Sequence, residues 1–386
     1  MKFLRDLFDN NQEKFMPGGT LERFGAIFRA TRTFFFFPSG RTSAAPHVRD
    51  CLDLKRFMGI VILALMPVTL FGIYNAGYQS LLASGQPPGF SGSLALGARL
   101  VVPIILVSYG VGFFWEILFA SIRKKEITEG LLVTGLLFPL TLPPAIPLWQ
   151  VAAGMSFGIV LGKEVFGGTG RNILNPALTA RAFVFFSYPM SMSGTSVWVA
   201  NPMGVDAVSQ ATPLALSAAT GSINDLLVHS GFTLGHLFLG LHPGSIGETS
   251  TLLCLLGAAI LIITGVGSFR IICGGIMGLI LTAALFNLLP GPQGTWFSAS
   301  PLNHLCAGGF ALGICFMATD PVSAPGTDAG RWIYGFLIGC LTVLIRAVNP
   351  AYVEGVMLAI LFMNLFSPLL DVVCVKLATR KRIPNV

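Results

Sequence analysis

Long apolar stretches recur along this chain, and they constrain its fold more than any other feature. Runs of roughly twenty residues, the length that crosses the hydrocarbon core of a bilayer, follow one another from Phe57 onward. Hydrophobic residues make up 53% of the chain and charged residues only 11%, whereas a soluble domain carries about a quarter charged residues. The chain is therefore predicted to be an all-α, polytopic membrane protein. About ten transmembrane helices are expected, at 57–78, 100–121, 128–142, 147–165, 176–190, 251–267, 271–289, 304–319, 331–348 and 353–375.

Basic residues predict the orientation, because Lys and Arg are retained on the cytoplasmic side of short loops. They gather before residue 57, at 123–125 and at 376–382, and none occurs between Ala182 and Phe269. The loop within that stretch is therefore expected outside, with both termini cytoplasmic. Arg346, near an outer end, does not fit this pattern. The net charge of +7 is spread over the predicted cytoplasmic edges, so membrane lipid is an expected partner and nucleic acid is not.

A recurring Asn-Pro-Ala segment predicts an internal duplication. It occurs at 175–177, after Arg171, and again at 349–351, after Arg346, on opposite sides of the predicted membrane. Two inverted five-helix repeats would produce this pattern and would place binding sites near the midplane, although a chance recurrence is the alternative. The predicted units are a cytoplasmic extension (1–55), a first repeat (56–190), an outer loop (191–250), a second repeat (251–377) and a cytoplasmic tail (378–386).

Cysteine and histidine spacing predicts no metal site in this chain. The 7 cysteines include no Cys-x-x-Cys pair, and six of them lie in or beside predicted spans. We interpret them as small residues of the apolar core.

The predicted outer loop carries the sequence Asp206-Ala207-Val208-Ser209-Gln210-Ala211-Thr212-Pro213. A threonine hydroxyl can be esterified by a phosphate, its small neighbours leave room for an enzyme, and Pro213 fixes the backbone after it. On chemistry alone, however, Thr212 is an ordinary loop threonine.

The pattern of this loop is similar to a flavinylation signal, and further motifs extend the resemblance over nearly the whole chain. They include Lys163-Glu164-Val165-Phe166-Gly167-Gly168-Thr169-Gly170-Arg171-Asn172, Pro243-Gly244-Ser245-Ile246-Gly247-Glu248 and Met317-Ala318-Thr319-Asp320-Pro321-Val322-Ser323. The chain thus resembles the family formed by the B subunit of the sodium-translocating NADH:quinone reductase and the D subunit of the Rnf complex. Its long N-terminal extension favours the first branch.

The resemblance implies a covalent FMN on Thr212, attached by a flavin transferase through a phosphoester. Asp206, Ser209 and Ala211 match the rest of the acceptor motif, whereas Gln210 stands where the family usually has Gly. The resemblance also implies noncovalent riboflavin at Asn172 and Asn175, whose amides suit the donor and acceptor edge of an isoalloxazine ring. The alternative is that these two residues satisfy backbone groups at a helix start.

A quinone region is implied at Gly112, Phe113 and Trp115. The family often has a second Gly at the position of Phe113, so the usual shape of that pocket is in question.

Two carboxylates, Glu116 and Asp371, are predicted to handle ions. A carboxylate within a span costs about 2.5–3.5 kcal/mol on insertion scales, so it is seldom kept without a use. Both lie near predicted cytoplasmic ends, where a cation would enter. The alternative is that they reach the interface or pair with Arg123 and Lys376 nearby.

The resemblance implies a subunit of a redox-driven sodium pump that passes electrons from NADH to ubiquinone. The A, C, D, E and F subunits would be its partners, and NADH would bind elsewhere, because this chain shows no dinucleotide-binding fold. An Rnf-type subunit acting with ferredoxin is one alternative. A passive channel or transporter, suggested by the doubled Asn-Pro-Ala, is the other.

Overall fold

The structure is a computed structural model that describes residues 9–15, 28, 54–123, 130–193, 197–200, 212–214, 232–289, 296–349 and 354–380. All regular secondary structure within these residues is helical. The prediction of an all-α chain is confirmed for them.

The helices follow the order of the predicted apolar segments. The first half contains α3 (Leu54–Ala83), α4 (Phe90–Arg123), α5 (Gly130–Leu140), α6 (Leu148–Ile159) with its π-helical continuation η3 (Val160–Glu164), α7 (Pro176–Ser187) and α8 (Pro189–Met192). The second contains α11 (Leu234–Leu239), α12 (Thr251–Ile263), α13 (Phe269–Leu288), η4 (Trp296–Ser298), α14 (Pro301–Cys306), α15 (Phe310–Leu312) with η5 (Gly313–Met317), α16 (Asp328–Val348) and α17 (Val356–Arg380). A short helix, η1 (Gln12–Phe15), precedes them.

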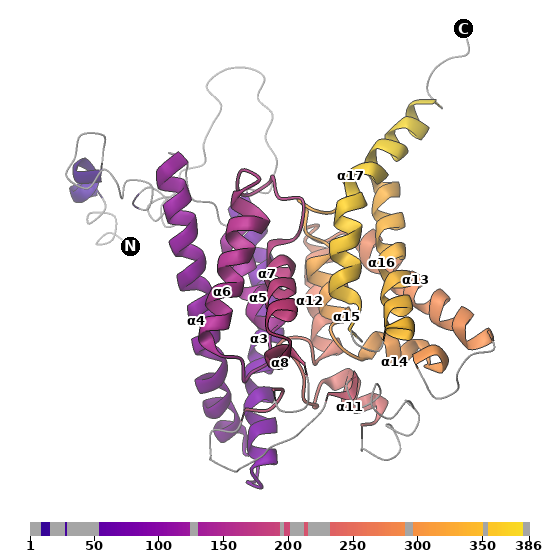
Figure 1. Ribbon diagram of the computed structural model, residues 1–386, viewed down its shortest axis with the longest axis horizontal. Helices are drawn as coiled ribbons and strands as arrows, with labels where there is room; N and C mark the ends of the chain where they lie inside the picture. The colour runs from indigo at the N-terminus through magenta and orange to yellow at the C-terminus, as the bar shows by residue number, and fades with distance from the viewer. Residues whose placement is uncertain are drawn as a thin grey trace.

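Within the described residues, five helices are long and apolar enough to cross a membrane. They are α3 (counted from Arg56), α4, α13, α16 and α17. In Figure 1, α3 to α6 lie at one end of the long axis, α13 and α16 lie at the other, and α7 and α12 lie between them. The chain is therefore a multi-pass membrane protein.

The other predicted spans coincide with shorter helices, and the sequence explains where each stops. α7 has 12 residues, or about 18 Å of helix against the roughly 30 Å of a hydrocarbon core. It begins at Pro176 and ends before Pro189. The predicted span 304–319 is interrupted, because α14 ends at Cys306 and Gly308 adopts a φ of 69° that other residues rarely accept. The prediction of one continuous helix over 304–319 was therefore wrong, whereas α6 with η3 and α7 run through most of the predicted spans 147–165 and 176–190.

Glycines let two helix pairs pack backbone against backbone. A β-carbon at Gly97 of α4 would lie 1.7 Å from the carbonyl oxygen of Ile73 on α3. A β-carbon at Gly339 of α16 would lie 2.1 Å from the carbonyl oxygen of Gly275 on α13. Such close approach is typical of membrane helices, where small residues allow the contacts that hold helices together.

The first Asn-Pro-Ala segment begins a helix, α7, whose first residues are buried, and the predicted span 176–190 starts at the same residue. Asn175 caps α7 through its side chain and Pro176 takes the first helical position, where a missing N–H costs nothing. The Asn175 Nδ2 also donates to the carbonyl oxygen of Met317, the last residue of η5, at 3.3 Å. The start of one short helix therefore meets the end of another.

Candidate functional site

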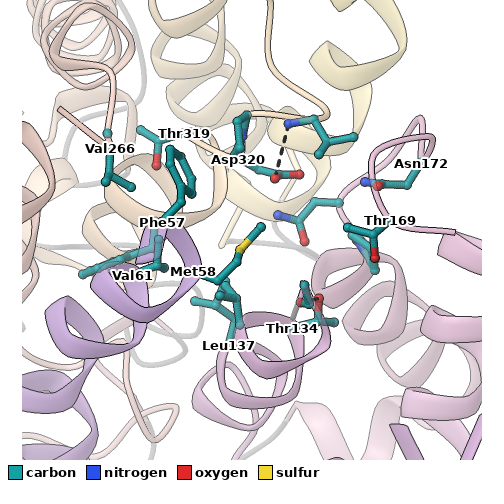
Figure 2. Close-up of a pocket in the computed structure, with 18 of the residues that line it drawn as sticks. Phe57, Met58, Val61, Thr134, Leu137, Thr169, Asn172, Val266, Thr319 and Asp320 are labelled. Carbon is teal, nitrogen blue, oxygen red and sulfur yellow. Dashed lines mark hydrogen bonds between the residues drawn. The ribbon is translucent and has the colours of Figure 1, made fainter. Parts of the chain in front are cut away.

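A cavity lies where the start of α7 meets the end of η5. It encloses about 680 Å³ of space not occupied by atoms, part of it open to solvent. Figure 2 shows residues from α3, α5, the connection before α7 and the segment after η5 arranged around this common space. The lining residues are Phe57, Met58, Val61, Gly130, Val133, Thr134, Leu137, Lys163, Thr169, Asn172, Asn175, Pro176, Leu261, Val266, Gly267, Phe316, Thr319, Asp320, Pro321 and Val322.

Both predicted riboflavin residues line this cavity. The amide nitrogen of Asn172 donates to the carbonyl oxygen of Leu174 at 3.0 Å. The Oδ1 of Asn175 accepts from the backbone of Ala177 at 3.0 Å and of Leu178 at 3.3 Å. The two asparagines thus satisfy backbone groups, as the alternative interpretation expected, and they also present polar side chains to the cavity.

Glu116 is buried in an ion pair with Lys163, which also lines the cavity. The acid comes from α4 and the base from η3. Next to this pair, Arg123 binds the Glu164 carboxylate at 2.9 Å, so Glu116 pairs across helices rather than with Arg123 on its own helix. Two ion pairs therefore join the end of α4 to η3 beside the cavity.

Asp371 lies apart from the cavity and binds the loop before α16. Its carboxylate accepts from the backbone N–H of Gly326 at 2.7 Å, and from the N–H and hydroxyl of Thr327 at 2.9 and 2.6 Å. These contacts tie α17 to the start of α16. The structure therefore does not bring Asp371 and Glu116 into one site.

Asp320 is a cavity residue that the sequence interpretation did not single out. It lies in the turn after η5, accepts from the Ser323 hydroxyl at 2.8 Å, and has a pKa raised by burial. The signal that could have found it was an acid directly after an apolar stretch.

The three residues of the implied quinone region face different ways. Gly112 is buried, and a β-carbon there would lie 2.7 Å from side-chain atoms of both Leu131 and Met155. Phe113 lies on the outer face of α4, while the indole nitrogen of Trp115 donates to the Ser156 hydroxyl at 2.8 Å. The bulky ring at position 113 therefore does not enter the packed interior of the chain.

Thr212 is buried away from the cavity. Leu214, two residues on, packs in a small cluster with Trp296, Ala299 and Ala307, at the connection between α13 and α15. The remaining acceptor residues, Asp206, Ser209 and Ala211, lie outside the described residues, as does Gln210.

A cluster of four charges, of which Arg181, Glu248 and Arg346 are buried and Glu354 is half-buried, was missed from the sequence. We call it the central charge cluster. Arg181 of α7 binds Glu248 at 3.2 Å and also binds Glu354. Arg346 donates to the backbone oxygens of Glu354 at 3.2 Å and Ala307 at 2.8 Å. The signal was present as Arg181 within a predicted span. The cluster also explains the charge misfit of Arg346, which is buried and hydrogen-bonded to backbone oxygens rather than exposed.

A protein-family match covers most of the chain. The sequence model of the NQR2, RnfD, RnfE family matches residues 41–379. The chain belongs to this family. The matched range contains the cavity, the Glu116–Lys163 pair, Thr212 and the central charge cluster.

Curated relatives within the family match almost from end to end. Proteins named as the B subunit of Na(+)-translocating NADH-quinone reductase from Pseudomonas paraeruginosa (strain DSM 24068 / PA7) and Pseudomonas aeruginosa (strain LESB58) are 46% and 47% identical. One of the same name from Azotobacter vinelandii (strain DJ / ATCC BAA-1303) is 47% identical. In each case the match covers 98% of this chain and 98% of the relative.

Proposed function

We propose that the chain is the flavin-carrying membrane subunit of a Na⁺-translocating NADH–quinone reductase. The observation that carries the proposal is the identity of 46–47% over 98% of both chains to proteins of that name. In this proposal the chain passes electrons toward ubiquinone and contributes to the ion path. It acts with the A, C, D, E and F subunits, in a bacterial inner membrane with both termini cytoplasmic.

The cavity near Asn172 and Asn175 is the proposed riboflavin site. Apolar side chains of Phe57, Met58 and Leu137 suit the faces of a flat ring, while amides and the hydroxyls of Thr134, Thr169 and Thr319 suit its polar edge. Riboflavin carries no phosphate, and the lining needs no phosphate-binding loop. The residues present therefore fit the group, which would supply electron transfer when bound.

The second proposed flavin is FMN esterified to Thr212 by a flavin transferase. Support comes from the acceptor motif and from the position of Thr212 outside the riboflavin cavity, which leaves room for two separate flavins. Gly112, Phe113 and Trp115 remain the proposed quinone region.

We propose ten membrane-embedded helical segments in two inverted five-helix repeats. The packing supports this: α4 contacts α6 and α6 contacts α7, while α13 contacts α16 and α16 contacts α17. One departure is that α17 begins at Val356, after non-helical residues 354–355, rather than at Pro350. Pro350 itself lies outside the described residues.

Replacement of Asn172 by Leu is expected to remove riboflavin while covalent FMN stays. The change keeps approximate side-chain size but deletes the amide at the cavity wall, leaving polar ring atoms without a partner. Acid extraction of the purified complex releases noncovalent flavin for chromatography, and the denatured chain retains covalent FMN. Asn287→Leu, which alters an amide bound to the Ala299 carbonyl outside the cavity, is the control. Normal riboflavin content in Asn172→Leu would contradict the assignment.

Glu116 and Asp371 are proposed to lie on the ion path. Glu116→Gln and Asp371→Asn are expected to raise the Na⁺ concentration needed for half-maximal quinone reduction, with normal flavin content, because each removes a negative charge that attracts the cation. Steady-state kinetics over a sodium series measures this. An unchanged sodium dependence would leave both as structural acids, and a response to pH alone would indicate protons.

A further inference from the structure

Lys163 belongs to two sites at once. It lines the cavity, and it pairs with Glu116, the acid buried on α4. Its side chain is 3% exposed and that of Glu116 is 4% exposed, so bulk water screens neither charge. Among the described residues that line the cavity, Lys163 is the only cation.

Because of its surroundings, the Lys163 ammonium is the dominant positive charge that acts on a flavin bound in the cavity. The neighbouring Arg123 is engaged with the carboxylate and backbone oxygen of Glu164. The other ionisable lining residue, Asp320, accepts from Ser323 and Val322 on another side of the wall, and burial raises its pKa, which favours its neutral form. Figure 2 shows Asp320 across the cavity from Thr134.

We propose that Lys163 sets the reduction potential of the cavity flavin and that Glu116 weakens this effect by sharing the same cation. The inference rests on the proposed riboflavin site. One electron, delivered by a reduced flavin or iron–sulfur centre of the complex, adds one negative charge to the ring when no proton accompanies it. A buried ammonium stabilises that charge, and a carboxylate behind the ammonium opposes it. Lys163 acts on the flavin directly through electrostatics, and Glu116 acts through Lys163 as a positioning residue.

The two members of the pair should therefore shift the potential in opposite directions. Lys163→Gln removes the stabilising cation and leaves Glu116 close to the cavity, so the potential of the cavity flavin should fall. Glu116→Gln leaves the cation without its counter-charge, so the potential should rise. Lys163→Arg keeps the charge and should stay near wild type, and the double variant should fall between the two single variants.

The test is a spectroelectrochemical titration of the purified complex carrying each variant. The covalent flavin of the same chain serves as an internal reference, because Thr212 lies outside the cavity. A structural role alone would change flavin content or stability without producing shifts of opposite sign. Shifts of the same sign, or no shift in Glu116→Gln with the flavin retained, would overturn the proposal.

Two further outcomes separate the proposal from the function on which it rests. If Lys163→Gln loses its flavin, the other two variants still test the proposal. It requires a higher reduction potential of the cavity flavin in Glu116→Gln together with an unchanged potential in Lys163→Arg. If the wild-type complex yields covalent FMN but no extractable riboflavin, the riboflavin site itself is refuted, and the role of Lys163 with it.

Discussion

Replacement of Thr212 by Val is expected to abolish flavin fluorescence of this chain on a denaturing gel. Valine keeps nearly the same shape, so the packing of the buried segment around Leu214 should change little, while the hydroxyl that forms the phosphoester is lost. The expected effect is complete, because a covalent bond either forms or does not. Fluorescence of the excised band, compared with protein stain, measures the result.

Thr212→Ser is the matched control for this experiment. It keeps a hydroxyl at the same position and should retain measurable fluorescence, so that a loss in both variants would indicate disturbed folding of the loop instead of a missing acceptor atom. Acid-extractable riboflavin should be normal in Thr212→Val, since Thr212 does not line the cavity. Undiminished gel fluorescence in Thr212→Val would refute the assignment.

The sequence predicted the long helices well, because their signal is local. The longest apolar runs became α3, α4, α13, α16 and α17. The role of Asn175 as the cap of α7 was likewise readable, since Pro at the first helical position follows a residue that caps well. Where Gly308 breaks a run, hydropathy alone still indicated a continuous span over 304–319, and that prediction failed.

The composition of the cavity could be predicted only in part. Asn172 and Asn175 came from the resemblance, but Thr134, Asp320 and Phe57 come together only through packing of α3, α5 and the segment after η5. The pairing of Glu116 with a base 47 positions away was equally invisible, because charge spacing along one helix favoured Arg123. Partners distant in sequence are set by tertiary structure, and a single sequence does not record them.

The central charge cluster gives the second large expected effect. Arg181→Met should lower the melting temperature of the complex, because it leaves the carboxylates of Glu248 and Glu354 without their shared cation. Breaking a buried pair by removing one partner costs about 3–5 kcal/mol. Arg270→Met is the control, since Arg270 pairs with an Asp328 side chain that is 64% exposed, and an exposed pair contributes no more than about 1 kcal/mol. Thermal unfolding at a fixed scan rate measures both.

The decrease in melting temperature caused by Arg181→Met should also depend on pH, and it should be larger at high pH than at low pH. Burial raises the pKa of Glu248, which lies in the connection before α12, and Arg181 is the strongest influence lowering it. Without Arg181 the native pKa rises further, so the folded state binds a proton more readily than the unfolded one. Below the ordinary pKa of 4.5, Glu248 is protonated in both the folded and the unfolded chain, so its burial as an ion costs no stability. As pH rises from 4.5 through the native pKa, the unfolded chain releases the proton first, and the folded state loses stability relative to it. The gap in melting temperature between Arg181→Met and wild type should be smaller near about pH 5.5 than near about pH 8.

Adding Glu248→Gln and Glu354→Gln to Arg181→Met should recover much of the loss in melting temperature at the higher pH, because neutral amides no longer require a cation. A gap independent of pH, with no recovery in the triple variant, would mean that Arg181 contributes packing and not charge to the interior.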